Sequence, residues 1–196
     1  MLLVIDTAEA ACSVALIEGS VCIAEHHEIV GRGHAERLVP AVGALLAARV
    51  PDGIAVDCGP GSFTGLRVGL AAARAFGLAW AIPVTGYSST AILAAAAFRL
   101  YPDDALATVQ MGGHGEVFVE TFQREGLTSI DGLASLPPEE ARRRIGSLRP
   151  VGSGAALVGG EDGLWPRAAD LALLPADRRV LPPPPIYGRA PDARPQ

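Results

Sequence analysis

The stretch GPGSFTGLRVG, residues 59–69, has the glycine content of a loop that comes very close to a ligand or to another backbone. Backbone N–H groups at the start of a helix can bind an anion such as phosphate. The stretch is not a GxxxxGK[ST] loop, because no lysine lies nearby, and Thr64 replaces the third glycine of GxGxxG. Two interpretations stay open: a tight strand-to-helix turn, or a nucleotide or phosphate contact through Gly59, Gly61, Ser62 and Thr64.

Few other residues suggest chemistry. Asp6 and Thr7 end the first apolar run, where they either orient a phosphate or a metal-bound water, or cap a turn. The glycine-rich residues 151–160 could bend around an adenine or a ribose, or form a pair of turns. His26 and His27 point to opposite sides of a strand, and neither HExxH nor GxSxG occurs. We therefore assign no catalytic residue and no metal site.

The helix expected after the glycine loop is apolar around nearly its whole circumference. Its charged residues, Arg67 and Arg74, are seven positions apart and share one narrow stripe with Ala71. One sheet cannot bury such a helix, so either another helix of this chain or another protein must cover the rest. We favour another protein, and expect Ala73→Glu to block assembly without unfolding the chain. Four small residues would let a partner helix approach closely: Gly69, Ala72, Ala73 and Gly77.

Composition limits the class of protein. The chain has 196 residues, of which 49% are hydrophobic and 19% are charged, as in ordinary globular domains. A net charge of −5 disfavours an autonomous nucleic-acid binder. We find no signal peptide and no membrane span, and the three cysteines lie in apolar runs, which is typical of buried free thiols in a reducing cytosol. A cytoplasmic protein is expected.

The first hundred residues alternate between strand and helix patterns. Strands are predicted at 2–6, 11–17, 21–29, 54–58 and 82–86, the first three forming an antiparallel meander with a hairpin turn at 18–20. Helices are predicted at 34–48, 66–80 and 88–100. This order predicts an α/β fold with a mixed sheet rather than a barrel or a plain doubly wound sheet.

A second, smaller region begins at Tyr101. Two strands are predicted around the turn at 112–115, followed by a short helix at 137–145. The four prolines at 182–185 predict an extended segment that acts as a spacer or covers a sheet edge. We therefore expect an N-terminal lobe at 1–100, a smaller C-terminal lobe at 101–186 and a flexible tail at 187–196.

The chain resembles the TsaB (YeaZ) family in a series of segments that follow one another in the family's order. These are VIDTAEAACSVAL, GHAERLVPAVGALL, GPGSFTGLRVGLAAARAFGLA, GEVFV, VGSGA and PIYGR. The resemblance implies two RNase H-like lobes of the actin/Hsp70/sugar-kinase (ASKHA) superfamily, with mixed sheets flanked by helices. It also implies a catalytically silent relative of TsaD, of the kind formerly labelled peptidase M22 or glycoprotease.

The same resemblance implies partners. The family works with TsaD and the ATPase TsaE to make N6-threonylcarbamoyladenosine in tRNA, so the chain is expected to be a non-catalytic subunit that meets tRNA only within the complex. No tightly bound cofactor is expected, although ATP or ADP could lie at the partner interface. The two helices at 34–48 and 66–80 would pair with TsaD, or with a second copy when the chain is alone. Their expected interface residues are His34, Arg37, Leu38, Val42, Leu66, Arg67, Gly69, Leu70, Ala73, Arg74, Phe76 and Gly77.

The sequence departs from the family at three places, and two other functions stay open. Met111-Gly112-Gly113 replaces the usual Asp-Ala-Arg before the GEVY-like strand, Gly188 replaces a leucine, and the chain is short for the family. A small ASKHA-type phosphotransferase or ATPase would use Asp6 and the glycine-rich stretches. A metallopeptidase would match the old family label, but the number and spacing of the histidines argue against it.

Overall fold

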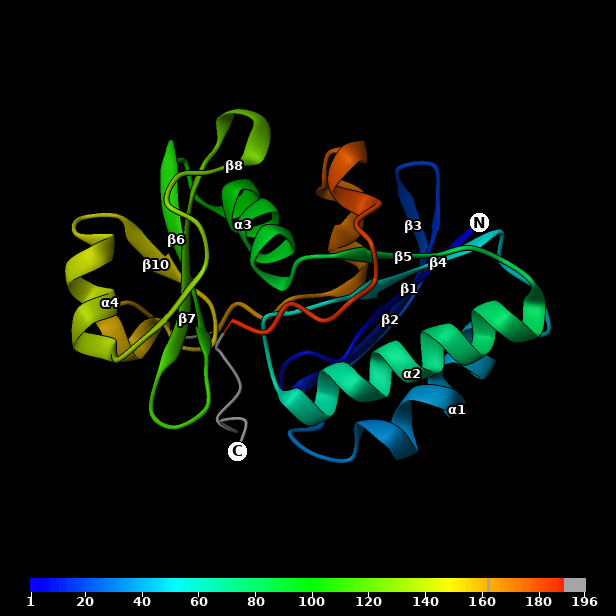
Figure 1. Ribbon diagram of the computed structural model, residues 1–196. Coiled ribbons are helices and arrows are strands. Elements are labelled where there is room, and N and C mark those ends of the chain that lie inside the picture. The colour runs from blue at the N-terminus through cyan, green and yellow to red at the C-terminus, as the bar shows by residue number, and fades with distance from the viewer. Residues whose placement is uncertain (162, 189–196) are drawn as a thin grey trace.

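The computed structural model describes residues 1–161 and 163–188, which form two β-sheets standing side by side (Figure 1). The first sheet has the strand order β3-β2-β1-β4-β5. Its antiparallel half is the predicted meander, and β1, β4 and β5 are parallel, so the predicted mixed sheet is confirmed. The bounds of its strands are Leu2–Asp6 for β1, Ala11–Glu18 for β2, Val21–Ile29 for β3, Gly53–Asp57 for β4 and Val84–Tyr87 for β5.

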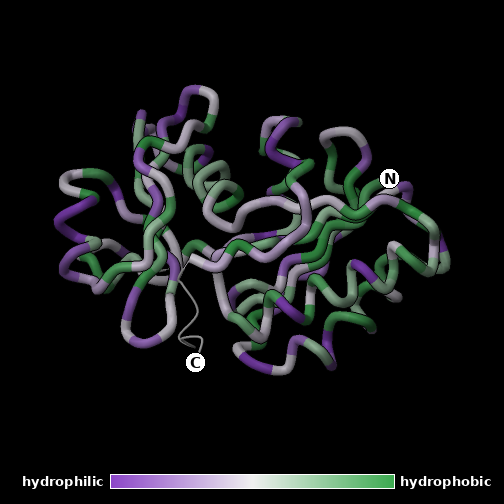
Figure 2. The backbone as a smooth tube through the Cα atoms, viewed as in Figure 1, coloured by the Kyte–Doolittle hydropathy of each residue, from purple (hydrophilic) through white to green (hydrophobic). Residues whose placement is uncertain are grey.

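Helices cover both faces of the first sheet. Helices α1 (His34–Leu46) and α2 (Phe63–Trp80) pack on one face, and α3 (Ser89–Leu100) packs on the other. Strands buried on both faces read as continuous apolar runs, which explains the hydrophobic colour of these strands in Figure 2. Helix α2 begins three residues before the expected Leu66, because Ser62 caps it by accepting the N–H of Gly65.

The second sheet has the order β10-β6-β7-β8, and β9 also pairs with β7. Helix α4 (Pro138–Ile145) packs on one face, while α3 packs on the other and thus lies between the two sheets. The GGHG turn joins β6 to β7, as predicted. The strands are Ala105–Met111 for β6, Val117–Gln123 for β7, Thr128–Ser129 for β8, Ala134–Leu136 for β9 and Arg149–Val151 for β10.

The C-terminal segment returns to the first sheet instead of staying with the second. The 3-10 turn Ala168–Leu173 buries Leu171 in the core behind that sheet, and Ala168 N donates to Ser13 Oγ at 3.0 Å. Leu181 then pairs with Gly86 of β5, so the proline segment covers a sheet edge, one of its two predicted roles. This return corrects the expected C-terminal lobe at 101–186, because residues 168–186 complete the N-terminal lobe.

The first two residues of the expected flexible tail make contacts within the chain. The ring of Tyr187 lies 5.9 Å from that of Phe63, and Phe118 contacts the backbone of Gly188 closely. Positions 189–196 lie outside the described residues, so the prediction for them stays a prediction. Within the described part of the chain, no helix is both long and apolar enough to cross a membrane.

Candidate functional site

A buried pair of carboxyl groups lies at the carboxyl ends of β1 and β4. These strands are parallel neighbours, and the register that pairs Ile5 with Val56 brings Asp6 and Asp57 side by side. The side chain of Asp57 accepts hydrogen bonds from Ser89 Oγ at 2.5 and 2.7 Å and from Gly59 N at 2.7 Å. Sequence reasoning chose Asp6 but missed Asp57, although both aspartates end an apolar strand.

Burial controls the charge of this pair. Removal from water raises the pKa of Asp6 to about 6, against the opposing effect of its hydrogen bond with Asp57. The pKa of Asp57 is raised well above its ordinary value by burial and by the neighbouring charge of Asp6. The hydroxyl of Tyr87, itself fully buried, donates to Asp6 Oδ2 at 3.3 Å. The pair thus holds a proton near neutral pH and is sealed within the fold.

The glycine loop after β4 uses its backbone groups within the chain. Gly59 N donates to Asp57, Ser62 N donates to Ala8 O at 2.6 Å, and Gly65 N donates to Ser62 Oγ at 3.3 Å. A side chain at Gly61 would overlap the carbonyl of Ala8. Three amides that could have bound a phosphate are therefore already bonded, and the loop has the character of a tight strand-to-helix turn.

A cleft of about 970 Å³ opens between the two lobes, beside this loop. Of the residues predicted to contact a nucleotide, Gly61, Ser62 and Thr64 line the cleft. Thr7 instead donates to Gly65 O at 2.8 Å and holds the start of α2, while Asp6 and Gly59 belong to the buried pair and its hydrogen bonds. The other lining residues come from several elements, among them the β1–β2 connection, the β6–β7 turn, α2 and the C-terminal part of the chain, and include Glu9, Met111, His114, Ser153, Trp165 and Tyr187.

The two helices predicted to meet a partner are only partly available to one. Eight of the twelve predicted residues are buried within the chain, and the glycines at 69 and 77 let α2 lie directly on Thr7 and Val84. Such positions cannot touch a partner, which corrects the predicted interface. The buried members are His34, Leu38, Val42, Leu66, Gly69, Leu70, Ala73 and Gly77.

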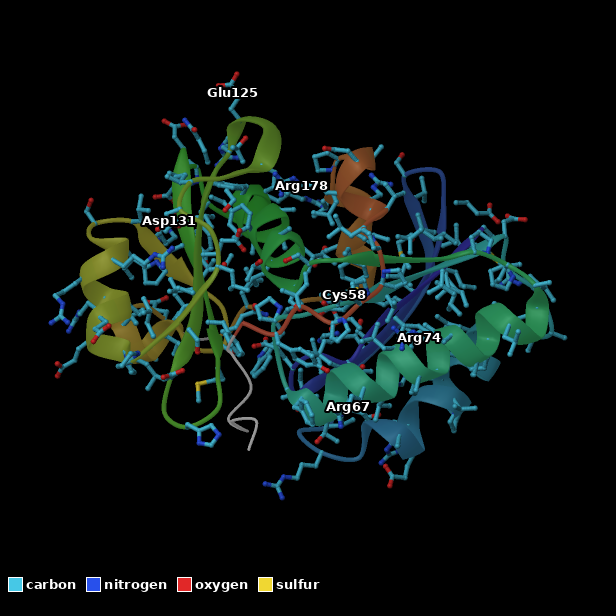
Figure 3. The ribbon with its side chains drawn as sticks, viewed as in Figure 1. Cys58, Arg67, Arg74, Glu125, Asp131 and Arg178 are labelled. Atoms are coloured by element: carbon cyan, nitrogen blue, oxygen red, sulfur yellow. The ribbon has the colours of Figure 1, made fainter. Side chains whose placement is uncertain are left out.

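The exposed side of the same helices keeps its apolar character. Leu78 is 87% exposed and Val39 is 55% exposed, which is unusual for large aliphatic side chains. Arg67 and Arg74, labelled in Figure 3, are exposed with Ala71 between them, as the predicted stripe requires. We call the exposed apolar residues the α1–α2 face: Val39, Pro40, Gly43 and Ala44 on α1, and Ala71, Ala75 and Leu78 on α2.

Arg37, Arg67, Arg74 and Phe76 complete the predicted interface set. Arg37 is exposed and lies 4.0 Å from Glu28, whereas Phe76 is half-buried and stacks on Trp80. Arg67 lies over the ring of Phe63, and Arg74 donates to the carbonyl of Pro183 at 3.1 Å. The arginines therefore border the α1–α2 face rather than fill it.

The described residues contain neither a cluster suited to a metal ion nor a buried thiol that ionises at neutral pH. Among them, no group of three or more His, Cys, Asp or Glu side chains could hold a metal ion. The three cysteines are free, as predicted. Burial raises the pKa of Cys12 to about 11 and that of Cys58 to about 12, which keeps both thiols protonated and unreactive at neutral pH.

Comparison with known proteins connects this architecture to a family. The family model described as "TsaD: tRNA N6-adenosine threonylcarbamoyltransferase" matches residues 25–135. The tRNA threonylcarbamoyladenosine biosynthesis protein TsaB of Escherichia coli is 33% identical, with 92% of this chain and 84% of that protein covered. An uncharacterized protein of Mycobacterium leprae is 34% identical over all of this chain, which spans only 56% of that longer relative.

Two solved structures of similar proteins have the same fold as this chain. A Pseudomonas aeruginosa protein described as similar to peptidase YEAZ superposes with a TM-score of 0.80 at 30% identity, covering 96% of this chain and 99% of that one. YeaZ from the same organism gives a TM-score of 0.77 at 32% identity, covering 88% and 89%. The first of these superpositions covers nearly the whole chain.

Proposed function

The chain belongs to the TsaB family of tRNA threonylcarbamoyladenosine biosynthesis proteins, and we propose that it is a non-catalytic subunit that binds a TsaD-like protein. In this proposal the partner carries the transferase chemistry, a TsaE-like ATPase joins the assembly, and tRNA is met only in the complex. The chain would work in the cytoplasm and pair with itself when the partner is missing.

The observation that carries the proposal is the α1–α2 face. Two neighbouring helices expose alanines, glycine and large aliphatic side chains along one side, with arginines at the border. Small residues let the backbone of another helix approach closely, and an apolar centre with a charged border is the usual anatomy of a protein interface. A second protein would remove this face from water without any change in the fold.

The hydrogen bonds of the buried carboxyl pair support a role without catalysis. Asp6 and Asp57 use their oxygen atoms on Tyr87, Ser89 and backbone amides inside the core, and they do not line the cleft. Three amides of the glycine loop, those of Gly59, Ser62 and Gly65, are bonded within the chain. The phosphotransferase alternative would use Asp6 and free loop amides at its substrate, so these contacts favour a binding subunit over that alternative.

We expect Leu78→Glu to weaken binding to the TsaD-like protein of the same organism by at least about thirtyfold, because it places a charge within the proposed apolar contact. The dissociation constants can be measured by titration calorimetry. The matched control is Ile130→Glu, since Ile130 is 55% exposed on the other lobe. That control should bind like the original chain, and both variants should keep its unfolding temperature. Equal affinities for Leu78→Glu and the original chain would place the interface elsewhere.

A further inference from the structure

We propose that the cleft between the lobes is a binding site for an organic ammonium ion, a protonated primary amine on an aromatic or aliphatic body, held by Glu9. The site is distinct from the α1–α2 face, and the inference does not rest on the proposed function. Its volume of about 970 Å³ is that of a pocket for a small molecule.

Glu9 is the polar anchor of this site. It follows β1 in the turn toward β2, where His34 contacts its carbonyl at 2.8 Å, and it is only 7% exposed although it lines the cleft. Ser153 of the opposite lobe donates to Oε1 at 2.5 Å. Among the described residues, Oε2 has no hydrogen-bond partner. A buried carboxylate oxygen without a donor is costly, so a donor from outside the chain is the expected occupant.

A second polar group lies beside it. Gln110 is fully buried on β6, and neither atom of its side-chain amide has a partner in the described part of the chain. Gln110 does not line the cleft, but its amide and the backbone N–H of Met111 are both close enough to Glu9 to lower the pKa of that carboxyl. An ammonium group carries three donors and no acceptor. It would therefore supply Glu9 Oε2 with the donor that it lacks, which an anionic ligand could not do.

The walls of the cleft suit the rest of such a ligand. Phe63, Phe118, Trp165 and Tyr187 line it, and the rings of Phe63 and Tyr187 form a tilted pair. Aromatic faces attract cations and cover apolar bodies equally well. One cation already uses this wall, because the Arg67 guanidinium lies 3.6 Å from the centre of the Phe63 ring.

The charge state of Glu9 gives the site a pH dependence. Burial raises the pKa of Glu9 to about 7, and the nearby charge of Asp6 acts in the same direction, whereas the Ser153 hydroxyl and the Gln110 amide lower it. The other charged or titratable side chains that line the cleft are Arg67, His114 and Tyr187. A primary amine stays protonated from pH 6 to pH 8, so its affinity should follow the ionisation of Glu9 and rise about tenfold over that range.

The test uses 2-phenylethylamine and the neutral isostere 2-phenylethanol as probes, with binding to the full chain followed by ligand-observed NMR. The amine should bind saturably at pH 8 and about tenfold more weakly at pH 6, and the alcohol should bind at least about tenfold more weakly than the amine at pH 8. Glu9→Gln, which keeps an acceptor for Ser153, should abolish the preference for the amine. Glu140→Gln, an exposed acid of α4, is the control and should change nothing.

Three results would overturn the proposal. The first is equal binding of the amine and the alcohol, and the second is unchanged binding of the amine by Glu9→Gln. The third is no binding of either probe, which would mean that the two buried polar groups bind water alone. Because Glu9→Gln should leave the affinity for the TsaD-like protein unchanged, failure at the cleft and failure at the α1–α2 face are separate outcomes.

Discussion

Ala73→Glu is expected to unfold the chain or to lower its free energy of unfolding by at least about 4 kcal/mol. Ala73 lies on α2 with 0% of its surface exposed, packed in the cluster that contains Leu3, Ile5 and Leu70. A glutamate there would insert a larger, charged side chain into a closed core without a partner for its carboxylate. This result reverses the expectation from sequence that the same change would block assembly and spare the fold.

The matched control is Ala75→Glu, which makes the same substitution two residues along the same helix. Ala75 is exposed on the α1–α2 face, so its free energy of unfolding should change by no more than about 0.5 kcal/mol. Urea denaturation followed by circular dichroism measures both variants. Equal destabilisation of the two, or a stable Ala73→Glu, would show that α2 is rotated about its axis relative to the structure described.

Asp57→Asn is expected to make the chain more stable at alkaline pH. In the folded chain the pKa of Asp57 is raised, whereas an unfolded aspartate titrates near pH 4. The stabilisation from the protonated carboxyl is therefore complete below about pH 4, and is lost as pH rises through the folded pKa. An asparagine copies the protonated form, because its amide oxygen can accept from Gly59 and Ser89 while its nitrogen donates to Asp6.

The measurement is urea denaturation of both proteins between pH 5 and pH 8. The difference in free energy of unfolding, original chain minus variant, should fall with rising pH by up to about 1.4 kcal/mol per pH unit. Asp177→Asn, at an exposed aspartate, should follow the original chain. Parallel curves for the original chain and Asp57→Asn would mean that the pair carries no extra proton in the folded state.

Much of the first lobe could be predicted from the sequence, because its signals are local. The strand meander and the turn at Gly19 each follow from residues within a few positions of one another. The two arginines on one stripe of α2 were also correctly placed as exposed. The family could be identified for the same reason, since its most specific segment is the continuous run from the glycine loop into α2.

The orientation of α2 could not be predicted, because its pattern lacks a polar face. Ala73 and Ala75 are indistinguishable by type, yet one is in the core and the other is in solvent. Only the register against Thr7 and Val84, which Gly69 and Gly77 permit, decides between them. The interface residues predicted on α2 from the sequence therefore include both core positions and surface positions.

The cleft was missed for a different reason. Its anchor depends on a hydrogen bond between Glu9 and Ser153, residues from different lobes and 144 positions apart. The returning C-terminal segment brings Trp165 and Tyr187 to the same place. No local spacing encodes these long-range contacts. Asp57 is the exception, because an aspartate at the end of a buried parallel strand, next to another, could have been recognised from the two strand patterns.

The most direct test of the proposed function is size-exclusion chromatography with light scattering on the chain mixed with the TsaD-like protein of its own organism. We predict a new species whose mass is the sum of one copy of each protein, and whose formation Leu78→Glu prevents. Two separate peaks with the masses of the unmixed proteins, at concentrations well above micromolar, would contradict the assignment of this chain as a TsaD-binding subunit.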